Sequence, residues 1–126
     1  MPKVGEISDD EYQDYHEIHR LTVECILDSI SKLKKRNRAP NITPGEVAEN
    51  DAKILELEAN IEILKKKLAA FEENKVSITP PTDPQLDSLK ELIAKVDKLN
   101  TNQKIFVEAV KLSTDALTEF NKIHPN

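Results

Sequence analysis

The sequence has little of what interrupts helices or builds covalent sites. Its 126 residues include two glycines, one cysteine, no tryptophan and only five other aromatic residues. A single cysteine, Cys25, excludes an internal disulfide and a multi-cysteine zinc site. No run approaches the roughly 18 apolar residues of a membrane span, and the stretch MPKVGEISDDEYQ lacks the apolar core of a signal peptide. We therefore expect a cytoplasmic chain with no membrane partner.

Helix breakers are confined to a few joints. All seven prolines and both glycines lie outside three long segments, 8–39, 46–79 and 85–124. Proline inside a helix costs about 3 kcal/mol, so its exclusion predicts that these segments are helical. The low apolar fraction of 38% favours a thin bundle over a compact globule. The sequence predicts a single all-α domain over residues 1–126, an elongated antiparallel three-helix bundle with coiled-coil-like packing and helices at about 8–38, 44–74 and 83–123.

The segment from Thr43 to Glu73 carries the most regular apolar repeat, at alternating steps of three and four residues. Its a positions are Val47, Ile54, Ile61 and Leu68, and its d positions are Asn50, Leu57, Leu64 and Phe71. We call these eight residues the seam. A second, weaker stripe consists of Ala48, Ala52, Leu55, Ala59, Ile63 and Ala70. Because the apolar surface is wider than one neighbour requires, we expect this helix to contact two neighbours.

The same helix carries the predicted interaction residues. They are Val47, Ile54, Leu57, Ile61, Leu64, Leu68, Phe71, Leu55 and Ile63. β-Branched residues at a with leucine at d favour two-stranded pairing, so we expect a homodimer, although the flanking charges do not settle its orientation. A three-helix monomer is the alternative, because the first and third helices can fill the same seam.

Capping signals place the first two helix starts. Ser8 with Glu11, and Thr43 with Glu46, match the capping box. The first helix should bury a stripe of Tyr15, Ile18, Thr22, Cys25, Ile26, Ile30 and Leu33, widened by Leu21, Val23 and Leu27. It ends in five basic residues between Lys32 and Arg38, which we interpret as complementing the helix dipole. Nucleic acid is not the expected partner, since residues 1–31 hold eight acidic residues against two basic ones.

The third helix is predicted to start at Thr82 or Asp83 and to end near Ile123, a length of roughly 60 Å. Its predicted seam is Leu89, Leu92, Val96, Leu99, Gln103, Phe106, Val110, Ser113, Leu117 and Phe120. Residues 100–103 are poor helix formers with a polar residue on that seam. A kink, a polar layer that sets the pairing register, or a solvated dip in helix propensity would each account for them.

Candidate chemistry is sparse. His16 and His19, three residues apart, could face one metal ion, but no further inward ligand accompanies them, and we expect a surface pair. Cys25 is expected to be a small core residue.

The sequence thus predicts no catalytic residue, cofactor or metal. It favours a non-enzymatic interaction or assembly protein acting through helical faces. The alternatives are a small acidic inhibitor or chaperone of the immunity or antitoxin type that masks a basic partner, and an enzyme or metal protein using the two histidines.

Overall fold

A computed structural model describes residues 4–102 and 104–125. After a short 3-10 helix, η1 (Val4–Glu6), it has four α-helices: α1 (Asp9–Arg36), α2 (Pro44–Glu72), α3 (Asp83–Asp97) and α4 (Ile105–Ile123). The all-α prediction is confirmed, but the prediction of three helices is wrong. The chain reverses direction between α3 and α4, so the single helix expected over 83–123 is two antiparallel helices. Gln103, predicted on the seam, lies outside the described residues.

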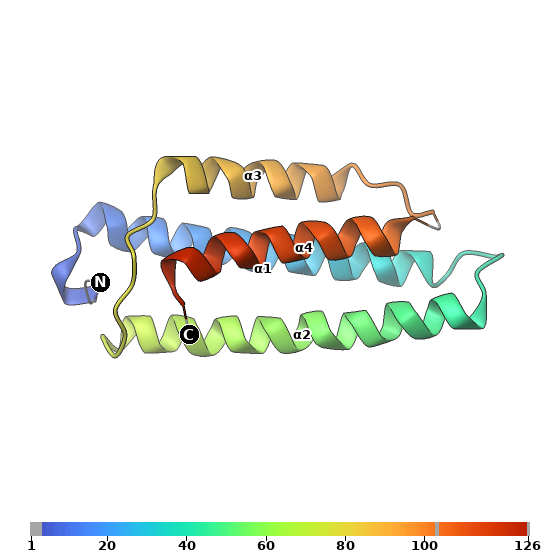
Figure 1. Cartoon of the computed structure of the whole chain (residues 1–126), viewed down its shortest axis with the longest axis horizontal. Helices are drawn as coiled ribbons and strands as arrows, with labels where there is room; N and C mark the ends of the chain where they lie inside the picture. Colours follow the sequence, from blue (N-terminus) through green and yellow to red (C-terminus); the bar gives the residue numbers. More distant parts are fainter. Residues whose placement is uncertain (1–3, 103, 126) are drawn as a thin grey trace.

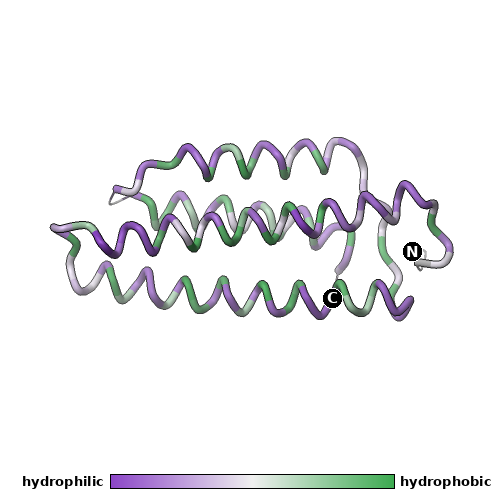
Figure 2. The backbone as a smooth tube through the Cα atoms, turned by 180° about the vertical axis from the view of Figure 1, so that it is seen from behind, coloured by the Kyte–Doolittle hydropathy of each residue, from purple (hydrophilic) through white to green (hydrophobic). Residues whose placement is uncertain are grey.

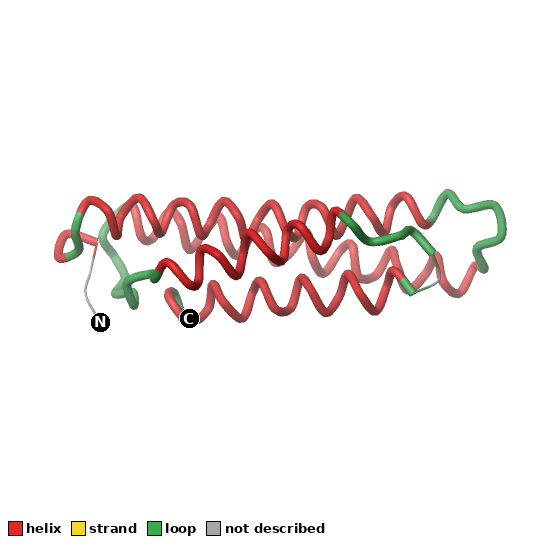
Figure 3. Tube along the Cα trace, turned by 90° about the horizontal axis from the view of Figure 1, so that it is seen from above, coloured by secondary structure: helices red, strands yellow, loops and turns green. Residues whose placement is uncertain are grey.

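The helices form an elongated body in which α1 is central (Figure 1). α1 makes the main contacts with α2, α3 and α4, and the other main contact joins α3 to α4. α1 and α3 run in one direction, and α2 and α4 in the other (Figures 1 and 3). Among the described elements, α2 therefore has one main helical neighbour, not the two expected.

Local sequence explains where the first helices begin. Ser8 and Glu11 form the predicted capping box: the Glu11 N–H donates to Ser8 Oγ at 3.1 Å, and Ser8 N–H donates to Glu11 Oε1 at 3.0 Å. At α2 only half of the predicted box forms. The Glu46 N–H donates to Thr43 Oγ1, while the Glu46 carboxylate pairs with Arg36 of α1. The second half of that cap thus becomes a bond between two helices.

The core runs along α1. Every residue of its predicted stripe is buried, so that prediction is confirmed. Of the residues expected to widen the stripe, Leu21 is buried and Val23 is partly buried. The prediction is wrong for Leu27, which is 50% exposed because it lies about 100° around the helix from Ile26. In α4 the buried face is shifted from the predicted seam by about one position, to Ile105, Ala109, Ser113, Ala116, Phe120 and Ile123. Phe106, Val110 and Leu117 are only partly buried. Figure 2 shows that hydrophobic residues recur along each helix between hydrophilic ones. In the described ranges no helix is both long and apolar enough to cross a membrane.

The connection from α2 to α3 packs across one end of the bundle. Asn74 adopts a left-handed conformation (φ 57°), which ends α2, and Ile78 is fully buried. The Thr79 N–H donates to the Ile123 carbonyl at 2.9 Å. These contacts tie the connection to the end of α4.

Candidate interaction surface

The structure separates the predicted interaction residues onto two faces of α2. Ile54, Leu57, Ile61, Leu64 and Phe71 are buried, and Val47 and Leu68 are partly buried. Leu55 and Ile63 are 69% and 49% exposed. At 100° per residue, Leu55 and Ile63 lie about 100° and 180° around the helix from Ile54. The seam is therefore part of the intramolecular core, and the other two residues remain accessible.

Contacts with α1 hold the seam in place. Phe71 stacks on Tyr15 with ring centroids 3.7 Å apart. His19 is buried, and its Nε2–H donates to the Leu64 carbonyl at 2.8 Å. Because a carbonyl only accepts hydrogen bonds, this contact places a proton on Nε2 of His19. Burial lowers the pKa of His19 below its usual value, which favours the neutral imidazole.

Polar contacts lock the other end of α2 to α1. The Arg36 guanidinium donates to both Glu46 oxygens, at 2.6 and 3.0 Å, in a partly buried pair. Asn50, the polar residue of the seam, is fully buried and donates through Nδ2 to Asn37 Oδ1 at 2.9 Å. Asn37 in turn donates to Asp51. Both ends of the seam are thus fixed to α1 by directional bonds.

We call the second stripe of α2 the outer stripe: Ala48, Ala52, Leu55, Ala59, Ile63 and Ala70. Its first five members are exposed, and Ala70 is partly buried. From the sequence, a second neighbour was predicted to cover this stripe. Instead α2 reaches α4 at one end, where Lys67 Nζ donates to the His124 carbonyl and to Asn121 Oδ1, both at 3.0 Å. The outer stripe is consequently an apolar face presented to solvent along most of α2.

Charges border the outer stripe unevenly. Residues 48–58 hold four acidic residues and one basic residue, while residues 60–70 hold one acidic and three basic residues. Two ion pairs, Lys53 with Glu56 and Lys65 with Glu62, lie within α2. The first half of the stripe is therefore in an acidic setting, and the second half in a basic one.

Lys32 and Arg36, two of the five basic residues at the end of α1, bond within the chain. Besides the Arg36 pair, Lys32 Nζ donates to the Asp97 and Leu99 carbonyls at 3.1 and 3.0 Å. Asp97 is the last residue of α3 and Leu99 follows its C-cap, so the Lys32 cation lies at the end of α3, where it also complements the helix dipole. Lys32 was predicted to serve the dipole of its own helix; it serves the end of a neighbouring one.

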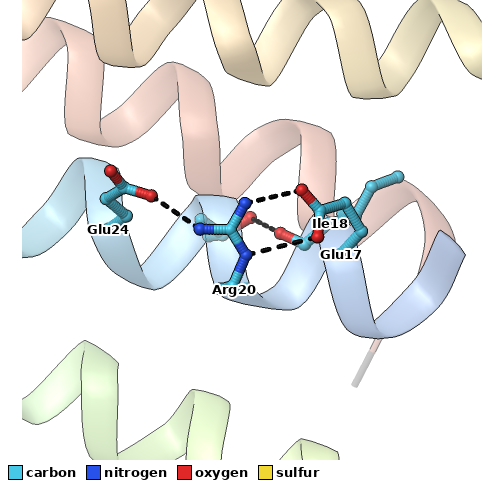
Figure 4. Close-up of polar contacts among 5 residues, drawn as sticks. Glu17, Ile18, Arg20 and Glu24 are labelled. Atoms are coloured by element: carbon cyan, nitrogen blue, oxygen red, sulfur yellow. Dashed lines mark hydrogen bonds and ion pairs between the residues drawn. The ribbon is translucent and has the colours of Figure 1, made fainter. Parts of the chain in front are cut away.

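The two histidines do not converge. The expectation of a surface pair is wrong for His19, which is buried, whereas His16 is partly exposed with Nε2 3.2 Å from Glu72 Oε1. Within the part of the chain that the structure describes, no three metal-ligating side chains gather as an ion site would require. Next to them on α1, Arg20 bridges Glu17 and Glu24 at the surface (Figure 4). This network is exposed and adds little to stability.

His124 is a polar core residue that the sequence did not reveal. Its Nδ1 lies 2.6 Å from the Tyr15 hydroxyl. Burial raises the pKa of Tyr15, so the hydroxyl keeps its proton and donates it to Nδ1. Burial, followed by the charges of Lys67 and His19, lowers the pKa of His124 to about 4. No helical repeat includes His124, because it follows the last residue of α4.

A second titratable cluster lies between α1 and α3. Burial raises the pKa of Asp28 to about 6, and a hydrogen bond to Asp97 and repulsion from it add to the shift. Cys25 is buried as predicted, and burial together with Asp28, Asp115, Asp97 and Glu24 raises the pKa of its thiol to about 12. A thiol in this setting stays protonated and is a poor nucleophile.

Comparisons with protein-family models, with curated proteins and with solved structures found no match to this chain.

Proposed function

We propose that this protein is a non-enzymatic interaction or assembly protein that acts as a scaffold or adaptor through its helical faces. The observation that carries the proposal is the outer stripe of α2, which leaves Leu55 and Ile63 in solvent. Large apolar side chains aligned along one helix face are typical of a helix that docks on another protein.

The interior supports the same proposal. Tyr15 bonds to His124, His19 bonds to the Leu64 backbone, and the thiol of Cys25 has a raised pKa. A general base or nucleophile needs a pKa near the working pH and access to a substrate. These side chains are buried and lack that access, and they join helices to one another, so packing is the role that their chemistry supports.

A matched pair of substitutions tests the proposal. Leu55 of α2 and Val107 of α4 are each 69% exposed, but only Leu55 belongs to the outer stripe. Leu55→Glu should abolish retention of proteins captured from the source organism's lysate, whereas Val107→Glu should retain them. Circular dichroism should give both variants the melting profile of the unmodified protein. Equal capture by the two variants would refute a role for the outer stripe.

An acidic inhibitor or chaperone is the second candidate, and one feature favours it. At the end of the bundle where α1 and α3 begin, Asp14 faces Asp83 of α3 as well as Asp10, Glu11 and Glu17 of its own helix. Burial and then these charges raise the pKa of Asp14. A basic partner bound here would dissociate as salt is added. Partner retention that fails in Asp14→Asn with Asp83→Asn, but survives Leu55→Glu, would favour this candidate.

A further inference from the structure

We propose that the outer stripe binds a second copy of the chain, with the two α2 helices antiparallel about a two-fold axis at Ala59. The inference rests on the proposed function, because it names the partner of the same face. The dimer expected from the sequence used the seam, which packs on α1. The proposed dimer uses the opposite face of α2 and leaves the seam where it is.

The outer stripe is self-complementary when one copy is reversed. In an antiparallel pair centred on Ala59, residue 59 + n of one copy lies opposite residue 59 − n of the other. Ala48 then faces Ala70, and Leu55 faces Ile63, in each case twice by symmetry. The spacing supports this alignment, because Ala48, Ala59 and Ala70 are 11 residues apart, as are Ala52 and Ile63. An 11-residue repeat keeps one face of a nearly straight helix in line, and α2 is 29 residues long.

Side-chain sizes also fit this arrangement. Alanines at both ends and at the centre allow two helix axes to approach to about 8 Å, the lower end of the usual range. Leu55 of one copy and Ile63 of the other fill the two positions between them. The large side chains thus face one another where the small ones leave room.

Charge selects the antiparallel orientation over the parallel one. Residues 48–58 carry four acids and one base, a net charge of −3, and residues 60–70 carry one acid and three bases, a net charge of +2. Antiparallel pairing places each acidic half beside a basic half, with Asp51 opposite Lys67. Glu56 lies opposite Glu62 and Lys53 opposite Lys65, but these four charges are already paired within their own helix. Parallel pairing places each acidic half beside the other acidic half. Lys66, which is exposed, occupies the outer-stripe position opposite Ala52 and lies beside the acidic half of the other copy. Such complementarity fixes orientation more than it adds affinity.

The shape of the molecule allows this approach, and its size limits the affinity. α2 lies at one edge of the bundle, so its outer face can meet a copy without displacing another helix (Figure 1). The stripe from Ala48 to Ala70 is about 33 Å long, and two such faces bury on the order of 1,000 Å² in total. This area is at the lower limit of specific interfaces. We therefore expect a dimer with a dissociation constant in the micromolar range.

Sedimentation equilibrium and paired cysteine variants test the inference. The unmodified chain should be a dimer at about 100 µM and dissociate on dilution. Leu55→Glu, which introduces two charges per dimer, should weaken association by about 100-fold or more, while Val107→Glu should leave it unchanged. Lys66→Glu should weaken association, and adding Glu49→Lys to it should restore much of the loss.

Disulfide formation reports the orientation. Under mild oxidation a mixture of an Ala48→Cys chain and an Ala70→Cys chain should cross-link, and each chain alone should not. The unmodified protein is the control, because its Cys25 is buried. Cross-linking of the Ala48→Cys chain with itself would indicate a parallel pair and overturn the inference. A dimer without any of these cross-links, or a chain that stays monomeric at about 100 µM, would also overturn it. In the monomeric case, lysate proteins held through Leu55 would leave the proposed function standing.

Discussion

Two leucines of α2, two residues apart, provide a direct test of how this helix is oriented. Leu57 is 1% exposed on the seam, and Leu55 is 69% exposed on the outer stripe. The substitutions Leu57→Ala and Leu55→Ala remove the same atoms from the same helix. Alanine has the higher helix propensity, and the difference is the same for both variants. Any difference in the free energy of unfolding therefore comes from burial alone.

The expected magnitudes follow from these exposed fractions. Leucine to alanine removes a group worth about 2 to 3 kcal/mol in transfer free energy when it is fully buried, and a cavity adds to the loss. Leu57 packs in the core of α1 and α2, so we expect Leu57→Ala to lower the free energy of unfolding by about 3 kcal/mol. Leu55 retains under a third of that burial. For Leu55→Ala we expect a change of about 0.5 kcal/mol or less.

Urea unfolding followed by circular dichroism measures both values. It should be run at low micromolar protein, because dimer formation would otherwise add a concentration-dependent stability that Leu55→Ala also reduces. Unchanged denaturant slopes would show that both variants unfold in the same way. A loss for Leu55→Ala equal to that for Leu57→Ala would contradict the assignment of the two faces. A loss below about 1 kcal/mol for Leu57→Ala would show that α2 is not held by its seam.

Three further predictions concern titratable groups, of which Tyr15 and His124 are buried and Asp28 is partly buried. Burial and Asp97 raise the folded-state pKa of Asp28 to about 6, so the ionised carboxylate destabilises the folded protein at higher pH. Asp28→Asn should therefore stabilise the protein at pH 8 by about 1 kcal/mol, and the gain should vanish by pH 4. Thermal melts at a series of pH values measure this difference. The pKa of His124 is lowered from 6.5 to about 4, so its contribution to stability is complete above pH 6.5 and is lost as pH falls toward 4. His124→Gln should remove about 2 kcal/mol of that pH dependence. If the free energy of unfolding of the variant changed with pH as steeply as that of the unmodified protein, the assignment would be refuted. Tyr15→Phe, which leaves Nδ1 of His124 unpaired, should cost about 1 to 2 kcal/mol in urea unfolding, and a neutral result would exclude the hydrogen bond. Cys25 serves as a common check, since its buried thiol should react with a thiol reagent only after unfolding.

Sequence alone predicted the features that depend on near neighbours in the chain. The cap at Ser8 and the buried stripe of α1 are written within a few residues, at the spacing of a helix. The seam of α2 is likewise buried on one face. What the sequence could not provide was the number of neighbours of each face. The outer stripe and the seam are both apolar, and only the positions of α3 and α4 decide which one is covered.

Contacts between distant residues were beyond the same reasoning. Tyr15 and His124 are 109 residues apart, and Glu46 pairs with Arg36 where a local cap was expected. In each case a side chain with a plausible local partner, or none, bonds to another helix. The spacing of residues in the sequence does not indicate which other helix a side chain bonds to, because periodicity describes one helix at a time.

The division of the predicted third helix has a physical cause in lengths. α1 has 28 residues and is about 42 Å long, while an unbroken helix over residues 83–123 would be about 60 Å long. About a third of its apolar seam would then extend past α1 into solvent. The reversal between α3 and α4 gives helices of 15 and 19 residues that both fit along α1 and bury Leu89, Val96, Ala109 and Phe120. The same turn leaves the carbonyls of Asp97 and Leu99 at the end of α3, where Lys32 donates to them.

The poor helix formers at residues 100–102 lower the free-energy cost of interrupting the helix, and the length of α1 makes the interruption favourable. With α3 and α4 both packed along α1, neither is left to cover the far side of α2, which is why the outer stripe stays exposed.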